Sequence, residues 1–425
     1  MSKNKIIAAV DIGSSKITTL VGQIVVDELT MGRQVNIIGV ANQEAHGVKK
    51  GQIVDIEEAV GATISSVEAA ERMAGYNIDH AYVSVGGAHV SSQNSKGVVA
   101  VSNSDGEVTS EDVARVVEAA RAISLPASRE VIHVIPRDFI VDGENGVRDP
   151  VGMSGVRLEV ETHIVTASSA ALKNLTKSIN EVGIQVDALV FSGLAAAQAT
   201  LTPTEKELGC VLIDVGSGTT SIAAFVDGGL AYTGAIPIGA RNVTNDLAIG
   251  LRVSLEAAEK IKLTLNRKAK DTDKHGKEVV DVAETGSDDT KKVSKRTIVE
   301  GIVRPRLNEI FGMVKRDLEK AGVINKIPSG AVVTGGGALT VGLEESAKRT
   351  LGLPTRIATP DGVGGLIDDI LEPQFATVIG LIVYASSQEP PFAQTSMMPG
   401  ISSKIKLPSS QKFAKMIDAV KNLLP

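Results

Sequence analysis

Two glycine- and hydroxyl-rich segments in different halves of the chain have the residue types needed to bind phosphate groups. The first is Asp11-Ile-Gly-Ser-Ser-Lys16, and the second is Asp214-Val-Gly-Ser-Gly-Thr-Thr220. Small residues let backbone amides approach a phosphate closely, and an aspartate at the start of such a turn can hold hydrated Mg²⁺. Either segment alone is compatible with an ordinary hairpin turn. Two copies in one chain predict a clamp that closes on one polyphosphate.

Strands must position these segments. Apolar, β-favouring runs precede them at residues 6–10 and 210–213 and follow them at residues 17–21 and 222–226. This order predicts a strand, a glycine-rich turn and a second strand in each half of the chain. Neither segment has the GxxxxGK[ST] spacing of a P-loop, so we expect a different kind of phosphate grip.

A third candidate segment is the triple glycine at residues 335–337, which follows the apolar run 330–334 and precedes a helix expected through 338–351. Bare backbone there would let a flat ring or a ribose lie against it, although three glycines by themselves also suit a turn. Glu259 and Lys262 lie three residues apart on a predicted helix, so both side chains can point the same way. They either face a nucleoside or form a surface ion pair.

The composition describes a globular α/β protein of several domains. The chain has 425 residues, which fits about two to four domains. Hydrophobic residues make up 43% and aromatic residues only 3%, so we expect cores of valine, isoleucine, leucine and alanine. The net charge of −6 argues against nonspecific nucleic-acid binding.

Cysteine, histidine and hydropathy patterns narrow the class further. The single cysteine, Cys210, cannot form an internal disulfide, and the six histidines show no metal-ligand spacing. The chain starts without a signal-like apolar stretch and has no run of about 18 apolar residues. We therefore expect a cytoplasmic protein that does not span a membrane.

Changes of pattern along the chain predict two insertions in a repeated core. Residues 82–165 alternate as strands around one helical run and indicate an inserted small α/β unit. The charged stretch 268–295 lies in a second insertion and is expected to be a solvated loop or exposed hairpin. Residues 386–410 are rich in Ser, Pro and Gln, and this composition predicts a flexible linker. The expected helices span 57–73, 110–123, 170–182, 193–201 and 297–321.

The last residues have the pattern of a short amphipathic helix with flanking lysines. Such a helix is marginal in water and needs a surface, which an anionic bilayer would supply. Docking on the protein's own core or on a partner is the alternative, and the preceding linker favours a tethered helix. The apolar face consists of Phe413, Met416, Ile417, Val420, Leu423 and Leu424.

The order of a first phosphate turn, a second phosphate turn and a glycine triplet resembles the actin, Hsp70 and sugar-kinase superfamily. Within it, the chain resembles the family of the bacterial cell-division protein FtsA over essentially its whole length. The motifs that carry this likeness are His133-Val-Ile-Pro-Arg-Asp-Phe, Asp149-Pro-Val-Gly-Met-Ser-Gly-Val-Arg-Leu158, His163-Ile-Val-Thr-Ala167 and Ala240-Arg-Asn-Val-Thr-Asn-Asp-Leu-Ala248.

The resemblance implies an α/β, actin-like fold of two lobes with a duplicated ribonuclease H-like core and two inserted subdomains, 1C and 2B. The subdomain 1C would replace the differently placed 1B of actin. The implied divisions are 1–81, 166–204 and 369–385 for 1A, 82–165 for 1C, 205–242 and 301–368 for 2A, 243–300 for 2B, 386–410 for a flexible linker and 411–425 for the membrane-targeting helix.

The resemblance also implies ATP with Mg²⁺ in the cleft between the lobes. Asp11 and Asp214 would hold the Mg²⁺ through water. Glu259, Lys262, Gly335, Gly336 and Gly337 would hold the nucleoside. The phosphates would contact Asp11, Gly13, Ser14, Ser15, Lys16, Asp214, Gly216, Ser217, Gly218, Thr219 and Thr220.

Two positions depart from the pattern of hydrolytic members of the superfamily. Ser192 stands where their connecting helix starts with a water-positioning glutamate, and Ser221 stands where the family more often has an aspartate. A hydroxyl is a poor general base at neutral pH. We therefore expect slow or negligible ATP hydrolysis, with ATP mainly locking the lobes, and leave the catalytic residues unassigned.

The function implied by the resemblance is a filament-forming scaffold that anchors FtsZ to the cytoplasmic face of the cell membrane at the division site. Arg304, Arg306 and Asn308 are the hypothetical contacts of the acidic FtsZ C-terminal peptide, with a solvated helix start as the alternative. Other division proteins would bind through 1C. The rival functions are a metabolic kinase, which needs an acid or base in the cleft, and a pilus-assembly scaffold, for which the basic terminal helix has no role.

Overall fold

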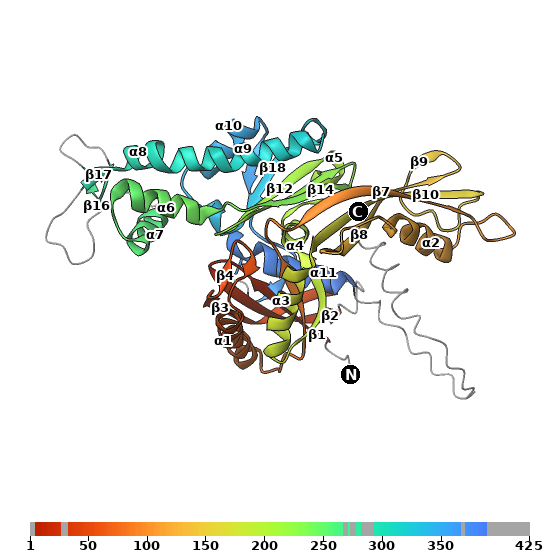
Figure 1. Cartoon of the computed structure of the whole chain (residues 1–425), viewed down its shortest axis with the longest axis horizontal. Helices are drawn as coiled ribbons and strands as arrows, with labels where there is room; N and C mark the ends of the chain where they lie inside the picture. Colours follow the sequence, from red (N-terminus) through yellow and green to blue (C-terminus); the bar gives the residue numbers. More distant parts are fainter. Residues whose placement is uncertain are drawn as a thin grey trace.

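The chain folds into two central lobes with one arm on each side, as Figure 1 shows. The structure is a computed structural model, and it describes residues 5–26, 33–266, 271–272, 278–281, 292–366 and 370–388. One arm contains α6, α7 and α8, and the other contains α2 and β7 to β10. Each arm is one of the two insertions that the sequence predicts within a repeated core.

The first lobe is built on a six-stranded sheet in the order β11-β6-β1-β2-β3-β20. β1, β2 and β3 form an antiparallel meander, and β6 and β11 add to it in parallel. The strands are β1 (Lys5–Ile12), β2 (Lys16–Val26), β3 (Arg33–Glu44), β6 (His80–Val85), β11 (Gln185–Phe191) and β20 (Gly364–Gly365), with the small hairpin β4 (Val48–Lys49) and β5 (Gln52–Ile53) after β3.

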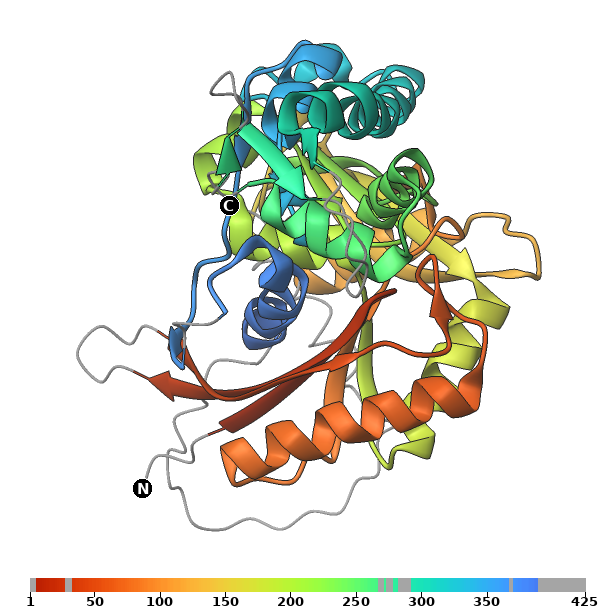
Figure 2. The ribbon, with the colours of Figure 1, turned by 90° about the vertical axis from the view of Figure 1, so that its left-hand side faces the viewer.

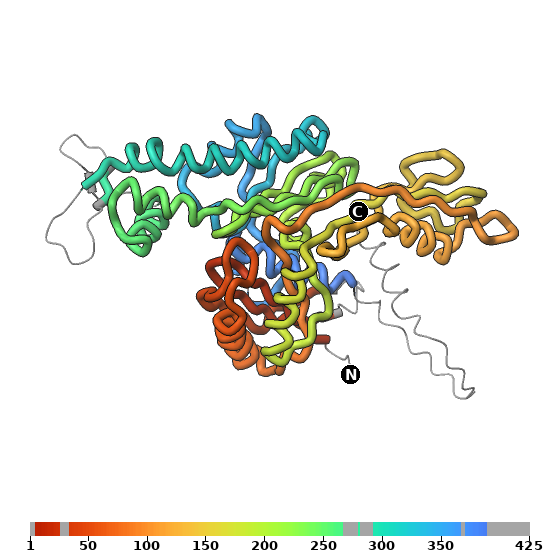
Figure 3. Tube along the Cα trace, in the orientation of Figure 1, coloured from red at the N-terminus to blue at the C-terminus, as the bar shows by residue number. Residues whose placement is uncertain are grey.

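Helices cover both faces of this sheet because alternate strand residues are apolar on each side. α1 (Ile56–Ala74) and α3 (Ser169–Glu181) lie on one face, and α4 (Ser192–Thr200) and α11 (Ala376–Gln388) lie on the other (Figure 2). Asp55 caps α1 by accepting a hydrogen bond from the Glu58 N–H, and Gly75 ends it at φ 71°. Figure 3 shows α11, from late in the chain, beside the first strands.

The second lobe repeats this strand order. Its sheet runs β14-β13-β12-β18-β19, with two antiparallel pairs followed by two parallel pairs, as in β3-β2-β1-β6-β11. The duplicated core expected of an actin-like fold is therefore present. The strands are β12 (Cys210–Val215), β13 (Thr220–Val226), β14 (Gly229–Ile236), β18 (Ala331–Thr334) and β19 (Thr355–Ile357), and α5 (Pro203–Leu208) precedes β12.

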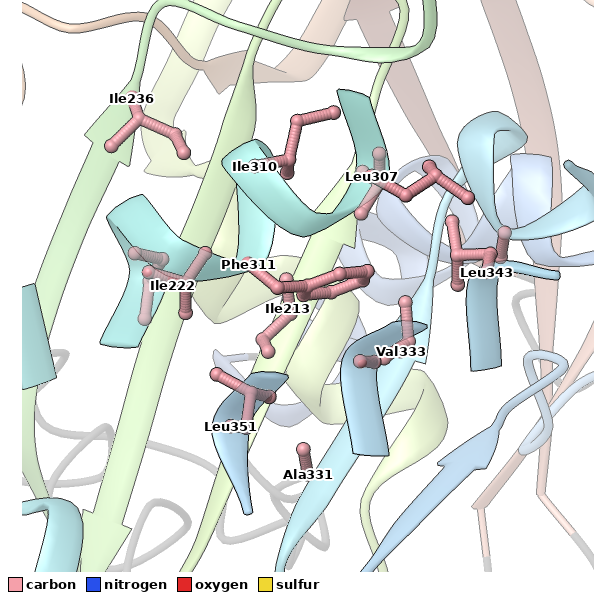
Figure 4. Close-up of a cluster of buried hydrophobic side chains, with 14 of the residues drawn as sticks. Ile213, Ile222, Ile236, Leu307, Ile310, Phe311, Ala331, Val333, Leu343 and Leu351 are labelled. Carbon is pink, nitrogen blue, oxygen red and sulfur yellow. The ribbon is translucent and has the colours of Figure 1, made fainter. Parts of the chain in front are cut away.

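The outer face of the second sheet packs against α9 (Arg304–Lys320) and α10 (Leu343–Leu351). Figure 4 shows Phe311 of α9 among side chains of the strands, including Ile213 and Val333. Each of these three is fully buried, and burying an aromatic ring with branched aliphatic residues stabilises the fold by about 2–3 kcal/mol for each side chain.

The first insertion forms a four-stranded sheet, β7-β10-β8-β9, covered by α2 (Ser110–Arg121). Thr109 and Asp112 form a reciprocal capping box at the start of α2. β6 pairs with β1 in the first lobe, so the insertion begins after β6 and not at residue 82. Its strands are β7 (Ser91–Ala100), β8 (Arg129–Val141), β9 (Glu144–Val147) and β10 (Arg157–Ser168).

The second insertion contains α6 (Ala240–Leu251) and α7 (Leu255–Thr264). Part of the charged stretch forms a small sheet of β15 (Asp271–Thr272), β16 (Glu278–Asp281) and β17 (Lys292–Ser294). α8 (Lys295–Ile298) continues through a π-helical turn, Val299–Val303, into α9. The predicted long helix is thus one run of three helical pieces.

The described part of the chain corrects the late boundaries. β20 pairs with β3, so the chain already returns to the first lobe at residue 364, and α11 extends to Gln388, three residues into the predicted linker. The rest of that linker and the amphipathic helix expected at 411–425 lie outside the described residues. None of the described helices is both long and apolar enough to cross a bilayer. Short 3-10 helices span Ile324–Lys326, Gly336–Leu339 and Pro373–Phe375.

Candidate nucleotide-binding cleft

The two predicted phosphate turns are closed by the same backbone hydrogen bond. In the first, the Gly13 N–H donates to the Lys16 carbonyl at 3.0 Å, and in the second the Gly216 N–H donates to the Thr219 carbonyl at 2.9 Å. Each turn joins the first two antiparallel strands of its lobe. The predicted order of strand, turn and strand is confirmed in both halves.

The turns also meet where the two lobes face each other. A Cβ atom added to Gly218 of the second turn would lie 2.7 Å from Ser14 Oγ of the first, so only glycine fits there. Two segments that lie about 200 residues apart in the sequence therefore face each other, as a clamp requires.

The aspartate of each turn is buried and receives one hydroxyl hydrogen bond. Ser84 Oγ donates to Asp11 Oδ1 at 2.5 Å, and Thr377 Oγ1 donates to Asp214 Oδ2 at 2.9 Å. Burial raises the pKa of Asp11 despite the hydrogen bond from Ser84 and the charge of Lys16. Burial also raises the pKa of Asp214 to about 6, and the negative charge of Asp11 adds to this shift. A divalent cation would stabilise both carboxylates in their charged forms.

Lys16 provides the opposite charge in the same cleft. Its Nζ atom is buried, has no hydrogen-bond partner among the described residues and lies 3.9 Å from the centroid of the Phe375 ring. Burial lowers the pKa of Lys16 to about 8, although Asp11 and Glu372 act in the other direction. A buried ammonium without a hydrogen-bond acceptor is energetically costly, and a bound anion such as a phosphate would stabilise it by forming a charge-assisted hydrogen bond. The donor set therefore fits Mg²⁺ together with a polyphosphate.

The glycine triplet borders this cleft. Gly335 has φ 86°, and a Cβ atom there would lie 2.2 Å from Asp214 Oδ1. Gly337 is equally confined, because its Cβ would lie 2.5 Å from Val215 Cγ1. Gly336, in contrast, is exposed. The helix expected directly after the triplet is a 3-10 turn, and α10 begins only at Leu343, because Gly342 interrupts the run at φ 73°.

Glu259 and Lys262 form an ion pair in which the lysine is buried and the glutamate is partly exposed. Lys262 is 8% exposed, and its Nζ donates to Glu259 Oε2 at 2.8 Å and to Thr244 Oγ1 at 3.0 Å. Asn266, just after α7, donates a hydrogen bond to the Leu339 carbonyl of the glycine segment. The end of α7 therefore contacts the glycine segment.

Sequence profiles and curated relatives agree on the family. The profile described as "SHS2 domain inserted in FTSA" matches residues 87–166, and the profile "Cell division protein FtsA" matches residues 211–380. The cell division protein FtsA of Borreliella burgdorferi is 39% identical to this chain over 96% of both chains. The chain belongs to the FtsA family of cell division proteins. The FtsA of Pseudomonas aeruginosa is 37% identical over 92% of this chain and 91% of its own.

Solved structures place the FtsA-family chain in the actin-like fold. The PilM–PilN type IV pilus biogenesis complex contains a chain that matches with a TM-score of 0.60 and 16% identity, over 88% of this chain and 97% of that one. MreB5 of Spiroplasma citri, solved with bound ADP, matches with a TM-score of 0.53 and 13% identity, over 90% and 96%. At these identities the likeness shows the fold alone. The fold class expected from the sequence is confirmed.

The two serines that depart from hydrolytic relatives contact each other. Ser192 Oγ, at the start of α4, and Ser221 Oγ, next to the second turn, lie 2.9 Å apart and are both buried. A pair of hydroxyls joins the lobes at this point, where a carboxylate would be needed to orient water. Slow hydrolysis by this FtsA-family member stays a prediction.

Four contributors to the cleft were missed by the sequence reasoning. Ser84 donates a hydrogen bond to Asp11 and Thr377 donates one to Asp214. The Phe375 ring packs against the ammonium of Lys16. Gly239 allows the start of α6 to approach the second turn, because a Cβ there would lie 2.4 Å from the Gly216 carbonyl oxygen. No sequence motif indicates these four residues, because each is distant in sequence from the residue that it contacts or lies in an element without a recognisable motif.

The residues predicted to bind the FtsZ peptide are engaged within the lobe. Arg306 donates through Nε and Nη2 to both carboxylate oxygens of Asp246, at 2.6 and 2.9 Å. Arg304 pairs with Glu300 and Glu345, and Asn308 accepts hydrogen bonds from residues 349 and 350. α9 begins at Arg304, as in the alternative of a helix start, but α8 and the π-turn precede it in one helical run and the Arg304 and Arg306 side chains are partly buried. A peptide carboxylate would have to compete with these partners.

The pKa of Asp214 predicts a pH dependence of stability in the nucleotide-free protein. Its folded pKa of about 6 lies above its ordinary value of 3.8, so the folded state binds more protons between these pH values. The contribution of Asp214 to stability is therefore complete below pH 4 and falls as pH rises to about 6. Denaturant unfolding from pH 4 to 7 should show this fall as a difference between the wild type and Asp214→Asn, in which it is absent. Parallel curves for the two proteins would contradict the assignment.

Proposed function

We propose that this chain is an ATP-binding, actin-like scaffold that polymerises on the inner face of the cytoplasmic membrane and tethers FtsZ filaments there. The observation that carries the proposal is the convergence of Asp11, Asp214 and Lys16 beside two turns that share the same backbone hydrogen bond. Membership of the FtsA family supports a role in cell division at the division site. The ADP complex of the similarly folded MreB5 supports a nucleotide in this cleft.

Mg²⁺ would neutralise charge on the phosphates, with Asp11 and Asp214 holding its water ligands. Lys16 would leave the face of Phe375 and pair with a phosphate oxygen, and the amides of the two turns would bind the others. The glycine triplet and the Glu259–Lys262 network would hold the nucleoside. Because both lobes contribute, the bound nucleotide would fix their relative orientation, with the hydroxyl pair of Ser192 and Ser221 leaving hydrolysis slow.

The membrane end of the proposal rests on the sequence of the last residues. The apolar face from Phe413 to Leu424 would lie in the headgroup region, and the nearby lysines would be attracted to anionic lipids. One short helix binds weakly, so stable attachment would come from several helices on one filament. FtsZ would dock on the second insertion near α9, and other division proteins on the first.

Two rivals have less support. A metabolic kinase needs a general acid or base beside a substrate pocket, and the described cleft offers paired hydroxyls at that point. A pilus-assembly scaffold shares the fold, but the matching chain of the PilM–PilN complex is 16% identical while an FtsA relative is 39% identical. Phosphorylation of a small substrate by the purified chain would revive the first rival.

Vesicle flotation tests both ends of the tether at once. With Mg·ATP and vesicles of phosphatidylglycerol and phosphatidylethanolamine, the full chain should float and carry FtsZ with it, because apolar burial and lysine attraction add along a filament. A chain that ends at Ser410 should stay at the bottom with the FtsZ. Equal flotation of both chains would contradict the membrane role of the terminal segment.

A matched pair of charge substitutions separates the contribution of apolar burial to membrane binding from the contribution of charge. Ile417→Glu places a carboxylate on the apolar face, whereas Asn422→Glu places the same charge on the opposite face. We expect the first to reduce flotation about tenfold and the second to reduce it less than threefold, since only the first removes buried apolar area. Similar losses in both would show that charge alone controls binding.

A further inference from the structure

The hairpin of β4 and β5 lies over the point where the two phosphate turns meet. Lys49 pairs with Gln52, so Lys50 and Gly51 form the tip. The Gly51 N–H donates to Ser14 Oγ of the first turn at 2.9 Å. A Cβ atom added to Gly218 of the second turn would lie 3.2 Å from the Lys50 Cα. One two-residue tip therefore touches both turns.

The backbone of the tip also packs closely against the segment around Gly87. A Cβ added to Gly51 would lie 2.8 Å from the Gly87 nitrogen, and one added to Gly87 would lie 3.0 Å from the Lys50 carbonyl oxygen. Gly87 lies in the connection from β6 into the first insertion. This close packing holds the backbone of the tip in one place over the cleft.

The residue type at the tip is unusual for its conformation. Lys50 and Gly51 have φ 50° and 70°, as both central residues of a type I′ turn require, and Asn or Asp is favoured at the first position. Two other two-residue hairpin loops of this chain have that preferred form, Asp142–Gly143 and Asp227–Gly228. The loop over the phosphate turns has a lysine in place of the aspartate.

The charge of Lys50 matches what the cleft would need. Asp11 and Asp214 provide two carboxylates and Lys16 one ammonium, while a magnesium–triphosphate complex is itself anionic. A further cation close to the phosphates would therefore strengthen binding. The Lys50 side chain is exposed, and its ammonium makes no hydrogen bond or ion pair with any described residue. An aspartate at this tip would repel the phosphates.

We infer that Lys50 is a third phosphate-contacting element, which folds its ammonium over the polyphosphate from the β4–β5 tip. The inference rests on the proposed nucleotide site and extends it to a hairpin outside both turns. Since the tip contacts Ser14 and lies beside Gly218, the ammonium would reach the phosphate chain where the two lobes converge. Lys50 thereby adds to affinity through charge, with the backbone of the tip already in place.

Calorimetric titration of the full chain with Mg·ATP tests the inference. Lys50→Asn removes the charge and supplies a residue that suits the positive φ, so the hairpin is retained. The dissociation constant should rise about tenfold, which corresponds to the loss of one charge-assisted hydrogen bond. The slope of affinity against salt concentration should also fall. Lys50→Arg should restore binding to within about threefold.

Lys49→Asn is the matched control, because it removes the same charge from the neighbouring position, which is also exposed but lies in β4 and not at the tip. Its affinity should stay within about twofold of the wild type. If the wild type binds Mg·ATP and Lys50→Asn binds equally well, the role of Lys50 is overturned and the nucleotide site stands. If the wild type shows no binding, the proposed nucleotide site itself is overturned.

Discussion

Replacing Lys16 with methionine is expected to weaken Mg·ATP binding about 100-fold while making the nucleotide-free protein more stable. The ammonium would be the buried cation nearest the phosphates, and losing a charge-assisted pair of this kind costs about 3 kcal/mol. Without nucleotide the same charge is buried with no hydrogen-bond partner among the described residues. Methionine keeps a sulfur–aromatic contact with Phe375, so the free energy of unfolding should rise by about 1–2 kcal/mol.

The pH dependence of the wild type provides a second measurement of the same effect. The pKa of Lys16 is about 8 in the folded state and 10.5 in an unperturbed lysine. The unfolded chain therefore binds more protons between these values, and wild-type stability should rise with pH across that window. Lys16→Met should lack this rise. Denaturant unfolding at pH 7.5 and 10 with calorimetry for Mg·ATP checks both effects, and a variant that is less stable yet binds normally would contradict them.

The second large effect is expected from Gly335→Ala. The new methyl group would lie 2.2 Å from Asp214 Oδ1 on a backbone with φ 86°, so both the side chain and the backbone would have to move. We expect the free energy of unfolding to fall by about 3 kcal/mol, from overpacking together with backbone strain. Displacement of Asp214 should also remove measurable Mg·ATP binding.

Gly336→Ala is the matched control for this substitution. The nearest atom to a Cβ at Gly336 is Gln374 Cβ at 3.7 Å, and Gly336 is exposed. Stability should therefore change by less than about 0.5 kcal/mol. Affinity for ATP should still fall, because Gly336 is one of the residues proposed to hold the nucleoside. Thermal unfolding of the two variants side by side decides the point, and equal stability of both would show that Gly335 is not confined.

Local sequence signals predicted the elements well. Asp55 and Gly75 bound α1, and Thr109 starts α2, because capping chemistry acts within a few residues of the chain. The strand-turn-strand units around Gly13 and Gly216 follow from short-range alternation and turn residues for the same reason. Errors occurred where pairing is distant, as when β6 and β20 joined the first sheet against the predicted boundaries.

The sequence by itself determined the family, the duplicated core and the two turns that face the cleft, because these depend on residue types at fixed short spacings. Tertiary structure alone decided what surrounds those turns. Thr377 donates a hydrogen bond to Asp214, which lies 163 residues away in the sequence. The Phe375 ring packs against the ammonium of Lys16, and the β4–β5 tip contacts both turns. Such contacts arise when separate lobes pack together, and their energy depends on burial and charge at distances that no local pattern records.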